Sequence, residues 1–333
     1  MSLIRVENLT KVFERPIRSD GIKGAIKDMF HRRYERKVAV DGLSFNIDQG
    51  EMVGYLGPNG AGKSTSIKML VGILVPTSGS VLVNEIVPHK HRLDNAKHIG
   101  VVFGQKSQLW WDIPVSETLN MMRYMYRIPN DIYKRNMEMF ADILGINEFM
   151  HVAVRQLSLG QRMRADLCAS LLHNPAIVYL DEPTIGLDVV VKKKIREFLL
   201  EVNRTLKTTV LITTHDMSDV EKLCSRVIIV NHGKKVYDGD LVQLRNEYGT
   251  GEVLSITFED NNPQVGFNVP GIERIEWQSD QQVTIFYDKG VINSANLLSH
   301  YMSRAKIIDF EVRPSEIEDV IQEIYGKQLG KIV

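Results

Sequence analysis

The feature that most constrains this chain is a glycine-rich motif flanked by two regular elements. Its pattern is G-x-x-x-x-G-K-S-T, and it consists of Gly57, Pro58, Asn59, Gly60, Ala61, Gly62, Lys63, Ser64 and Thr65. The apolar run 52–56 before it is typical of a buried strand, and residues 66–71 after it are typical of the first turns of a helix. Strand, glycine-rich loop and helix in this order indicate a phosphate-binding P-loop.

The chemistry of such a loop predicts a bound nucleoside triphosphate. Glycines let the backbone turn tightly, so that successive N–H groups point at phosphate oxygens, and the N-terminus of the following helix adds positive potential. Lys63 can reach the β- and γ-phosphates, and the Ser64 hydroxyl can ligate Mg²⁺. A chance glycine-rich turn is the alternative, and the flanking strand and helix argue against it.

The composition gives no support for a nucleic-acid partner, a metal-binding cysteine cluster or a membrane span. Lysine plus arginine and aspartate plus glutamate both number 41, so that the net charge gives no reason to expect a nucleic-acid partner. Cys168 and Cys224 are far apart and form no metal-binding pattern, which fits a reduced compartment. The start of the chain lacks the apolar run of a signal peptide, and no stretch reaches the roughly 18–20 apolar residues of a membrane span. We expect a soluble protein that reaches a membrane only through something else.

The order of strand and helix patterns predicts two domains. Strands alternate with helices up to about residue 248, which favours an α/β core with a mostly parallel sheet. A helical subdomain is expected at about 106–160. After the turn at 248–251, residues 252–333 predict a small accessory α+β domain, whose last helix, 315–325, starts with a capping box of Ser315 and Glu318.

The segment 15–37 differs in composition from the rest of the first domain, 1–248. Basic residues outnumber acidic ones, and Ile22, Ile26, Met29 and Phe30 fall at helical spacing. This pattern predicts a short basic amphipathic helix. Such a helix either covers its own domain or contacts a membrane surface or membrane subunit, and the residues favour neither.

Two adjacent carboxylates, Asp181 and Glu182, follow the apolar strand predicted at 176–180. Ligands of α/β proteins bind at the carboxyl ends of the strands, so these side chains are expected beside the P-loop. Asp181 would belong to the Mg²⁺ shell, and Glu182 would polarise the attacking water. A buried strand that merely ends in an acidic turn is the alternative, which the P-loop disfavours.

Two more polar residues follow predicted strands. Gln105 comes after the strand 99–103, where its amide could reach both Mg²⁺ and water, and His215 comes after the strand 210–214, where it could contact a γ-phosphate. Taken alone, each would more often be structural or solvent-facing.

The segment Leu157-Ser158-Leu159-Gly160-Gln161, here called the signature segment, runs into a predicted helix. With the P-loop, Gln105, Asp181-Glu182, Asp188 of Gly186-Leu187-Asp188, and His215, it makes the chain resemble the ABC ATPase family over about residues 3–245. The expected fold is therefore a P-loop ABC ATPase core with an antiparallel β subdomain and a helical subdomain. The resemblance implies ATP and Mg²⁺, with Ser64, Gln105 and Asp181 around the metal and Glu182, His215 and Gln105 serving hydrolysis.

In that family the signature segment of one subunit covers the γ-phosphate held by the P-loop of another. The resemblance thus implies a head-to-tail dimer with two ATP molecules, in which Ser158, Gly160, Gln161 and Asp188 act on the partner's nucleotide. A helix N-terminus suits this role. Leu159 departs from the family, which has a second glycine here, and this puts in doubt a close backbone approach to phosphate.

Adenine is normally stacked on an aromatic side chain in this family. Phe13, at the end of the first predicted strand, and Tyr34, whose distance from Lys63 along the sequence is the usual one, are the two candidates, and Phe13 is preferred. The segment 15–37 makes the choice ambiguous.

Within the family the chain resembles the ATPases of ABC-2 type exporters, through the form of its P-loop, residues 238–240 and the closing 313–320. The resemblance implies a second copy or a homologous ATPase, separate integral membrane permease subunits and a cytoplasmic location at the inner face of the cell membrane. An importer ATPase and a non-transport ABC ATPase are the alternatives. Trp110 and Trp111 are either an interface socket for a partner helix or core residues.

Overall fold

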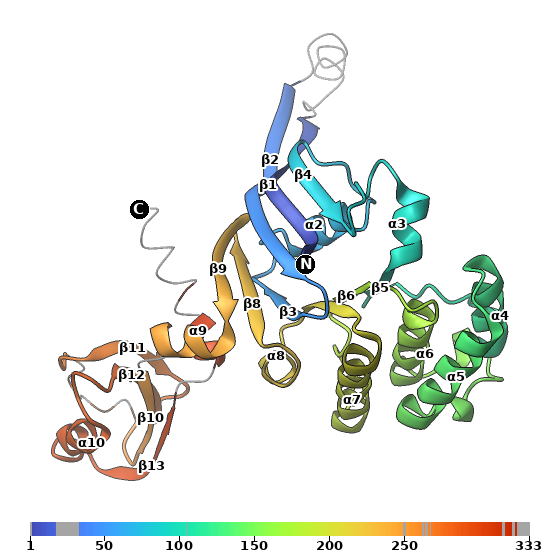
Figure 1. Cartoon of the computed structure of the whole chain (residues 1–333). Helices are drawn as coiled ribbons and strands as arrows, with labels where there is room; N and C mark the ends of the chain where they lie inside the picture. The colour runs from blue at the N-terminus through green and yellow to red at the C-terminus, as the bar shows by residue number, and fades with distance from the viewer. Residues whose placement is uncertain are drawn as a thin grey trace, which may run out of the picture. The chain divides into compact units, whose positions relative to one another are not determined.

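The computed structural model describes residues 2–17, 33–104, 106–248, 251–261, 263, 266, 268–314, 317–321 and 324. The chain divides into two compact units, Met1–Asp238 and Gly239–Val333 (Figure 1). The first unit contains a six-stranded sheet, a three-stranded sheet and helices, and the second contains a four-stranded sheet with its own helices. The two units are described separately below.

The six-stranded sheet is the centre of the first unit, with strand order β5-β6-β7-β3-β8-β9. Its strands are β3 (Met52–Leu56), β5 (Ile99–Phe103), β6 (Ile177–Asp181), β7 (Thr209–Thr213), β8 (Arg226–Asn231) and β9 (Lys234–Asp240). Strands β5, β6, β7, β3 and β8 pair in parallel. Every residue of β3 and β7 is buried, as expected for central strands covered on both faces. The predicted parallel sheet is confirmed.

The three-stranded antiparallel sheet has the order β2-β1-β4 and consists of β1 (Ser2–Ile17), β2 (Arg33–Asp48) and β4 (Ser78–Val83). Its inner face shares one apolar core with the central sheet, to which Ile4 and Phe45 contribute from one side and Val53 and Tyr55 from the other. This is the antiparallel β subdomain that the family resemblance implied.

Strands β1 and β2 are longer than the sequence pattern suggested. They remain paired out to Ile17 and Arg33, with Phe13 opposite Lys37 and Arg15 opposite Glu35. Both ends of the segment 15–37 are therefore strand and not helix, because each strand satisfies the backbone hydrogen bonds of the other. The apolar positions of the predicted amphipathic helix, Ile22, Ile26, Met29 and Phe30, lie outside the described residues.

Helices connect the strands of the first unit and are seen beside the central sheet in Figure 1. They are α2 (Lys63–Leu70), α3 (Arg92–His98), α4 (Val115–Met125), α5 (Asn130–Leu144), α6 (Leu159–Leu171), α7 (Val189–Leu206) and α8 (Met217–Leu223), with 3-10 turns at Ile146–Glu148 and Val154–Gln156.

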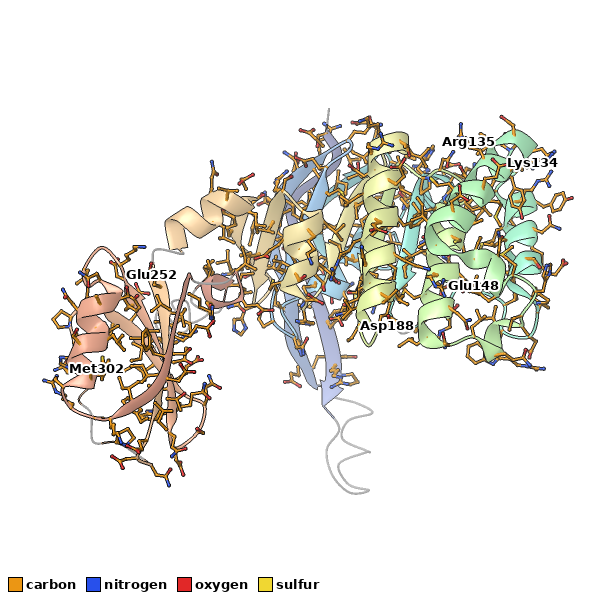
Figure 2. The ribbon with its side chains drawn as sticks, turned by 90° about the horizontal axis from the view of Figure 1, so that it is seen from below. Lys134, Arg135, Glu148, Asp188, Glu252 and Met302 are labelled. Carbon is orange, nitrogen blue, oxygen red and sulfur yellow. The ribbon has the colours of Figure 1, made fainter. Side chains whose placement is uncertain are left out.

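Helices α4, α5 and α6 gather at one side of the first unit (Figure 1). The buried Arg164 on α6 donates to the carbonyl oxygen of Leu144 at 2.6 Å, and its guanidinium lies 4.8 Å from the ring centroid of Phe149. Phe140 of α5 meets Phe198 of α7 edge to face, with centroids 5.4 Å apart. Figure 2 shows Lys134 and Arg135 on the outer part of α5 and Asp188 at the start of α7. These contacts join α6 to the end of α5, and α5 to α7.

The second unit begins with α9 (Leu241–Tyr248) and is built on the antiparallel sheet β11-β12-β10-β13. Its strands are β10 (Gly251–Phe258), β11 (Ile272–Trp277), β12 (Gln282–Asp288) and β13 (Ile307–Pro314). Helix α10 (Ser294–Met302) covers one face with the fully buried Leu297 and Tyr301. Ser315 of the predicted capping box lies outside the described residues. The sheet and helix make this unit α+β, and within the described ranges no helix of either unit combines the length and apolarity needed to span a membrane.

Candidate functional site

The P-loop connects β3 to α2, and its backbone geometry requires glycine at two positions. Gly62 caps α2 with φ of 102°, in the region that side chains rarely adopt. A Cβ at Gly62 would lie 2.4 Å from the carbonyl oxygen of Ala39, and one at Gly57 would lie 2.3 Å from the carbonyl oxygen of Val230. The glycines therefore serve both the turn and the close approach of neighbouring backbone.

Lys63 is the buried cation of the loop. Its ammonium donates to the carbonyl oxygen of Gly57 and, at 3.2 Å, to that of Pro58. Burial lowers the pKa of Lys63, while the nearby carboxylates of Glu182 and Asp181 act in the opposite direction. An anionic phosphate would provide Lys63 with a stronger acceptor than these neutral carbonyls.

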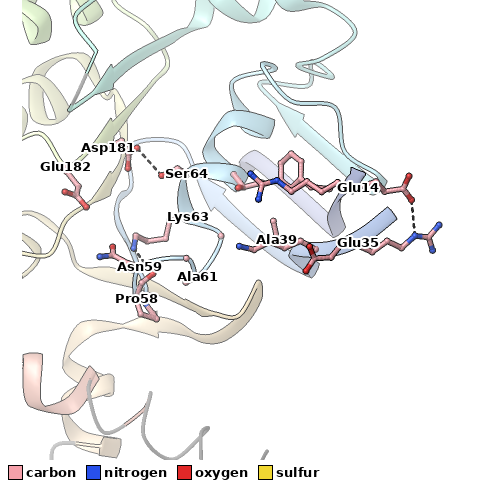
Figure 3. Close-up of a pocket in the computed structure, with 17 residues that line it drawn as sticks. Glu14, Glu35, Ala39, Pro58, Asn59, Ala61, Lys63, Ser64, Asp181 and Glu182 are labelled. Atoms are coloured by element: carbon pink, nitrogen blue, oxygen red, sulfur yellow. Dashed lines mark hydrogen bonds and ion pairs between the residues drawn. The ribbon is translucent and has the colours of Figure 1, made fainter. Parts of the chain in front are cut away.

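Ser64 and Asp181 come together although they are far apart in the sequence. The Ser64 hydroxyl donates to Asp181 Oδ2 at 3.3 Å (Figure 3). The Thr213 hydroxyl donates to Asp181 Oδ1 at 2.5 Å. Strand β7 thus fixes the carboxylate that ends β6, and the carboxylate faces the first turn of α2. Hydroxyl and carboxylate oxygens are ligands that Mg²⁺ prefers, so this pair fits the predicted metal. In the described part of the chain, no group of three or more His, Cys, Asp and Glu side chains is arranged to hold a metal ion.

Glu182 and His215 form the second polar pair. His215 Nε2 lies 3.0 Å from Glu182 Oε1. Glu182 has φ of 57°, and its N–H donates to the Thr213 carbonyl at 2.9 Å, which turns the side chain out of the strand direction. The structure therefore brings together the two residues that the sequence placed at the ends of separate strands.

The loop that carries His215 is held by a residue that sequence reasoning missed. Lys192 on α7 donates to Asp216 Oδ2 at 2.6 Å, next to His215 in the chain. The signal for this pair was weak, because a lysine on a helix is usually solvated and the partner of Lys192 lies on another element.

Gln105 lies outside the described residues, whereas the residue before it, Gly104, is described. The Gly104 N–H donates to the Asp181 carbonyl at 2.9 Å, and a Cβ at Gly104 would lie 2.9 Å from that oxygen and 3.0 Å from the Glu182 carbonyl. Gly104 therefore lies against the backbone of the two carboxylate residues. The Gly-Gln pair directly after a strand was the sequence signal for this approach.

One cavity of about 770 Å³ joins the P-loop to the two carboxylates and to the hairpin of β1 and β2 (Figure 3). Its lining includes Pro58, Asn59, Gly60, Ala61, Gly62, Lys63, Ser64, Thr65, Asp181, Glu182 and Phe13. Tyr34 is not among the lining residues. Phe13 is 39% exposed, and the Lys11 ammonium lies 5.3 Å from its ring centroid. Of the two aromatic candidates, Phe13 is therefore the one that shares a cavity with the P-loop.

The hairpin also brings charged residues to the cavity that sequence reasoning did not assign to the site. Arg15, Glu35 and Lys37 line it beside Phe13. They come from the strand pairs Phe13–Lys37 and Arg15–Glu35, so that they share the face of the hairpin on which Phe13 lies. Because their pattern predicted a helix, their place beside the P-loop was not foreseen.

The signature segment forms the start of α6 and does not line this cavity. Ser158 Oγ accepts from the Gln161 N–H at 3.2 Å, while the Gln161 side chain accepts from the Ser158 N–H at 2.9 Å, which is a capping box. The cap accounts for the N–H groups of Ser158 and Gln161. The N–H groups of Leu159 and Gly160, also in the first helical turn, have no acceptor within the helix itself.

Two further contacts place the signature segment beside the loop before α7. The Leu159 side chain lies 3.3 Å from the position that a Cβ on Gly186 would occupy. The Val191 side chain lies 3.3 Å from the position that a Cβ on Gly160 would occupy. Asp188 caps α7 by accepting from the Val191 N–H at 2.9 Å. Leu159 stays 40% exposed, and neither Asp188 nor Ser158 lines the cavity beside the P-loop of its own chain.

Comparisons with known proteins agree with this arrangement. Residues 40–185 match the protein family described as ABC transporter. The chain is 31% identical over 301 residues to the Nod factor export ATP-binding protein I of Ralstonia nicotianae, which covers 90% of this chain and 92% of that relative.

Solved structures show the same fold. A dimeric post-hydrolysis structure of the ATP-binding cassette MJ0796 bound to ADP and Pi matches with a TM-score of 0.58 and 25% identity, over 72% of this chain and 98% of that one. The structure of cbiO1 from Clostridium perfringens, part of the ABC transporter complex cbiONQ, matches with a TM-score of 0.59 and 26% identity, over 74% and 91%.

The similarity to the Nod factor export protein extends over nearly the whole of both chains, so it covers the P-loop, the two carboxylates and the signature segment together. These are the parts to which the family resemblance assigns the binding and hydrolysis of ATP. The chain therefore belongs to the family of ABC transporter ATP-binding proteins and is an ATPase.

Proposed function

We propose that this chain is the ATP-hydrolysing subunit of an ABC-2 type exporter. Two copies, or one copy and a homologous ATPase, would close around two ATP molecules and drive export through separate integral membrane permease subunits at the inner face of the cell membrane. Residues 1–248 would form the nucleotide-binding domain and 252–333 the accessory domain. The observation that carries the proposal is that the signature segment does not line the cavity that contains the P-loop and the two carboxylates.

The position of the signature segment outside this cavity supports a dimer. The cavity provides Lys63, Ser64, Asp181 and Glu182, whereas the signature segment begins α6 elsewhere on the same unit. The Leu159 and Gly160 N–H groups and the positive N-terminal end of α6 would stabilise a bound anion. A head-to-tail partner would bring them, with Ser158, Gln161 and Asp188, to the second face of each ATP. The MJ0796 cassette was solved as a dimer, which supports this arrangement.

The residues of the cavity suit hydrolysis. Ser64, Asp181 and Gln105 would ligate Mg²⁺, which neutralises charge on the β- and γ-phosphates. Lys63 would hold the same phosphates from the P-loop side. Glu182 would orient the attacking water and accept its proton, and His215, whose Nε2 lies 3.0 Å from Glu182 Oε1, would contact the γ-phosphate.

The surface beside α6 fits a permease contact. Trp110 and Trp111 are 39% and 52% exposed, so they are not core residues, and Arg162 of α6 lies 5.9 Å from the Trp111 ring. Aromatic residues of this kind anchor interfaces. We propose that they receive a helix of the permease and that the segment 106–156 transmits closure of the ATPase dimer to it.

Replacing Phe13 with alanine should weaken ATP binding by about 5- to 10-fold, because the base loses its stacking surface. Tyr34→Ala is the matched control and should change the apparent KM for ATP by less than about twofold, since Tyr34 does not line the cavity. The measurement is the ATP dependence of phosphate release. If Tyr34→Ala had the larger effect, the base would lie on the other strand of the hairpin.

Purification from membranes tests the exporter assignment. The tagged chain should bring down a membrane protein with about six spans, and everted vesicles that contain both should accumulate the cargo when ATP is added. Recovery of a permease whose vesicles move cargo outward would show an importer. Failure to recover any permease from membranes would favour a non-transport ABC ATPase.

A further inference from the structure

Asp166 is a buried carboxylate that the proposed reaction does not use. It lies in the middle of α6 and is only 6% exposed. Its Oδ1 accepts from the Ser107 hydroxyl at 2.9 Å and from the Gln108 N–H at 3.0 Å. The Gln108 side chain donates in turn to the Asp166 carbonyl oxygen at 3.0 Å. Three hydrogen bonds thus join one helical residue to two consecutive loop residues.

The loop 107–111 continues along α6 beyond these bonds. The Leu109 N–H donates to Ser107 Oγ at 3.2 Å, and the Leu109 side chain is buried. One turn before Asp166 on the same helix, Arg162 lies over the Trp111 ring. The loop is therefore attached to α6 at both ends of the segment, and Asp166 makes the buried attachment.

Burial raises the pKa of Asp166 to about 6, against the hydrogen bonds from Gln108 and Ser107 and the charge of Arg162, which lower it. Burial thus makes ionisation of this carboxyl less favourable than it would be in water. A neutral side chain at this position would avoid the free-energy cost of burying a charge. Stability of the fold alone therefore does not explain a carboxylate here.

The two elements that Asp166 joins lead to different nucleotides in the proposed dimer. Ser107 lies two residues after Gln105, and Gly104, the residue before Gln105, is hydrogen-bonded to the Asp181 carbonyl in the chain's own site. Helix α6 begins at the signature segment, which would face the ATP of the partner. A rigid connection between the two would make both contacts move together.

We propose that Asp166 is a positioning residue that ties the segment following Gln105 to α6, so that the contact to the chain's own ATP and the contact to the partner's ATP are held as one unit. This inference rests on the proposed dimer. It assigns no contact with ATP to Asp166 itself.

Three variants test the proposal. Asp166→Ala removes the acceptor, Asp166→Asn keeps an acceptor oxygen without the charge, and Ser107→Ala removes one donor. Asp142→Ala is the matched control, an exposed aspartate on α5. For each we would measure kcat for ATP hydrolysis, the affinity for ADP, which the P-loop binds without a partner, and the melting temperature.

Asp166→Ala should lower kcat by about 10- to 100-fold, because small misplacements of a reacting group are costly, while ADP affinity stays within about twofold and the melting temperature stays near that of the unaltered chain. Asp166→Asn should restore at least a third of the activity. Ser107→Ala should lower kcat about threefold, and combined with Asp166→Ala it should add nothing further, because the two residues share one contact.

Other results would overturn the proposal. Unchanged kcat in Asp166→Ala excludes it. If that variant failed to fold, multiplicative effects of Ser107→Ala and Asp166→Asn in combination would exclude it as well. Failure of the dimer itself is separate, because it would show in Glu182→Gln, which leaves Asp166 intact and should accumulate as an ATP-bound dimer.

Discussion

Replacing Glu182 with glutamine should lower ATP hydrolysis by at least about 100-fold and cause an ATP-bound dimer to accumulate. A glutamine amide cannot accept the proton of the attacking water, and a positioned general base typically contributes 10²- to 10⁴-fold. The amide keeps the size of the side chain and can still bond to His215, which lies 3.0 Å from the carboxylate in the native protein. Binding should therefore survive while turnover stops.

Phosphate release and light scattering with MgATP would measure the two effects. Glu138→Gln, an exposed change on α5, is the control and should hydrolyse ATP normally and remain in equilibrium with monomer. A Glu182→Gln protein that stayed monomeric at saturating ATP would rule out the proposed dimer, even if its hydrolysis were lost.

Replacing Lys63 with alanine should raise the Kd for ATP by about 100-fold. Lys63 is the buried cation of the P-loop, and its charge-assisted bonds to phosphates would be lost, which costs about 3 kcal/mol or about 100-fold in Kd. Lys68→Ala, an exposed change one turn later on α2, removes the same charge from the helix and should leave the Kd within about twofold.

Titration calorimetry with ATP in the presence of Mg²⁺ would give both values. A small effect of Lys63→Ala would mean that the P-loop backbone alone carries the affinity, and that the ammonium bound to the Gly57 and Pro58 carbonyls is structural.

Several parts of the site could be predicted because their chemistry is contiguous in the sequence. The P-loop lies within one strand–loop–helix unit, and Asp181 and Glu182 end a single apolar strand. The parallel order of strands then brings the ends of β3, β6 and β7 to one edge, which is why Thr213 and Ser64 both reach Asp181. Local pattern and sheet topology were enough for these residues.

Other parts depended on pairing between distant segments. The pattern of 15–37 predicted a helix, but the described ends of that segment extend the β1–β2 hairpin, because long-range pairing overrides local periodicity. That extension places Arg15, Glu35 and Lys37 beside the P-loop and decides between Phe13 and Tyr34 in the cavity. If these strand ends were helical, other residues would line this side of the cavity.

The P-loop motif by itself determined that this chain binds a nucleotide triphosphate, because a glycine-rich turn between a buried strand and a helix has few other uses. The signature segment determined the family. Only the tertiary structure showed that Phe13 and not Tyr34 lines the cavity, how Gly104 approaches the two carboxylate residues and that Asp166 joins α6 to the loop after Gln105. The reason is physical: a motif specifies a local backbone conformation, whereas each of these contacts joins residues that only folding brings within hydrogen-bond distance.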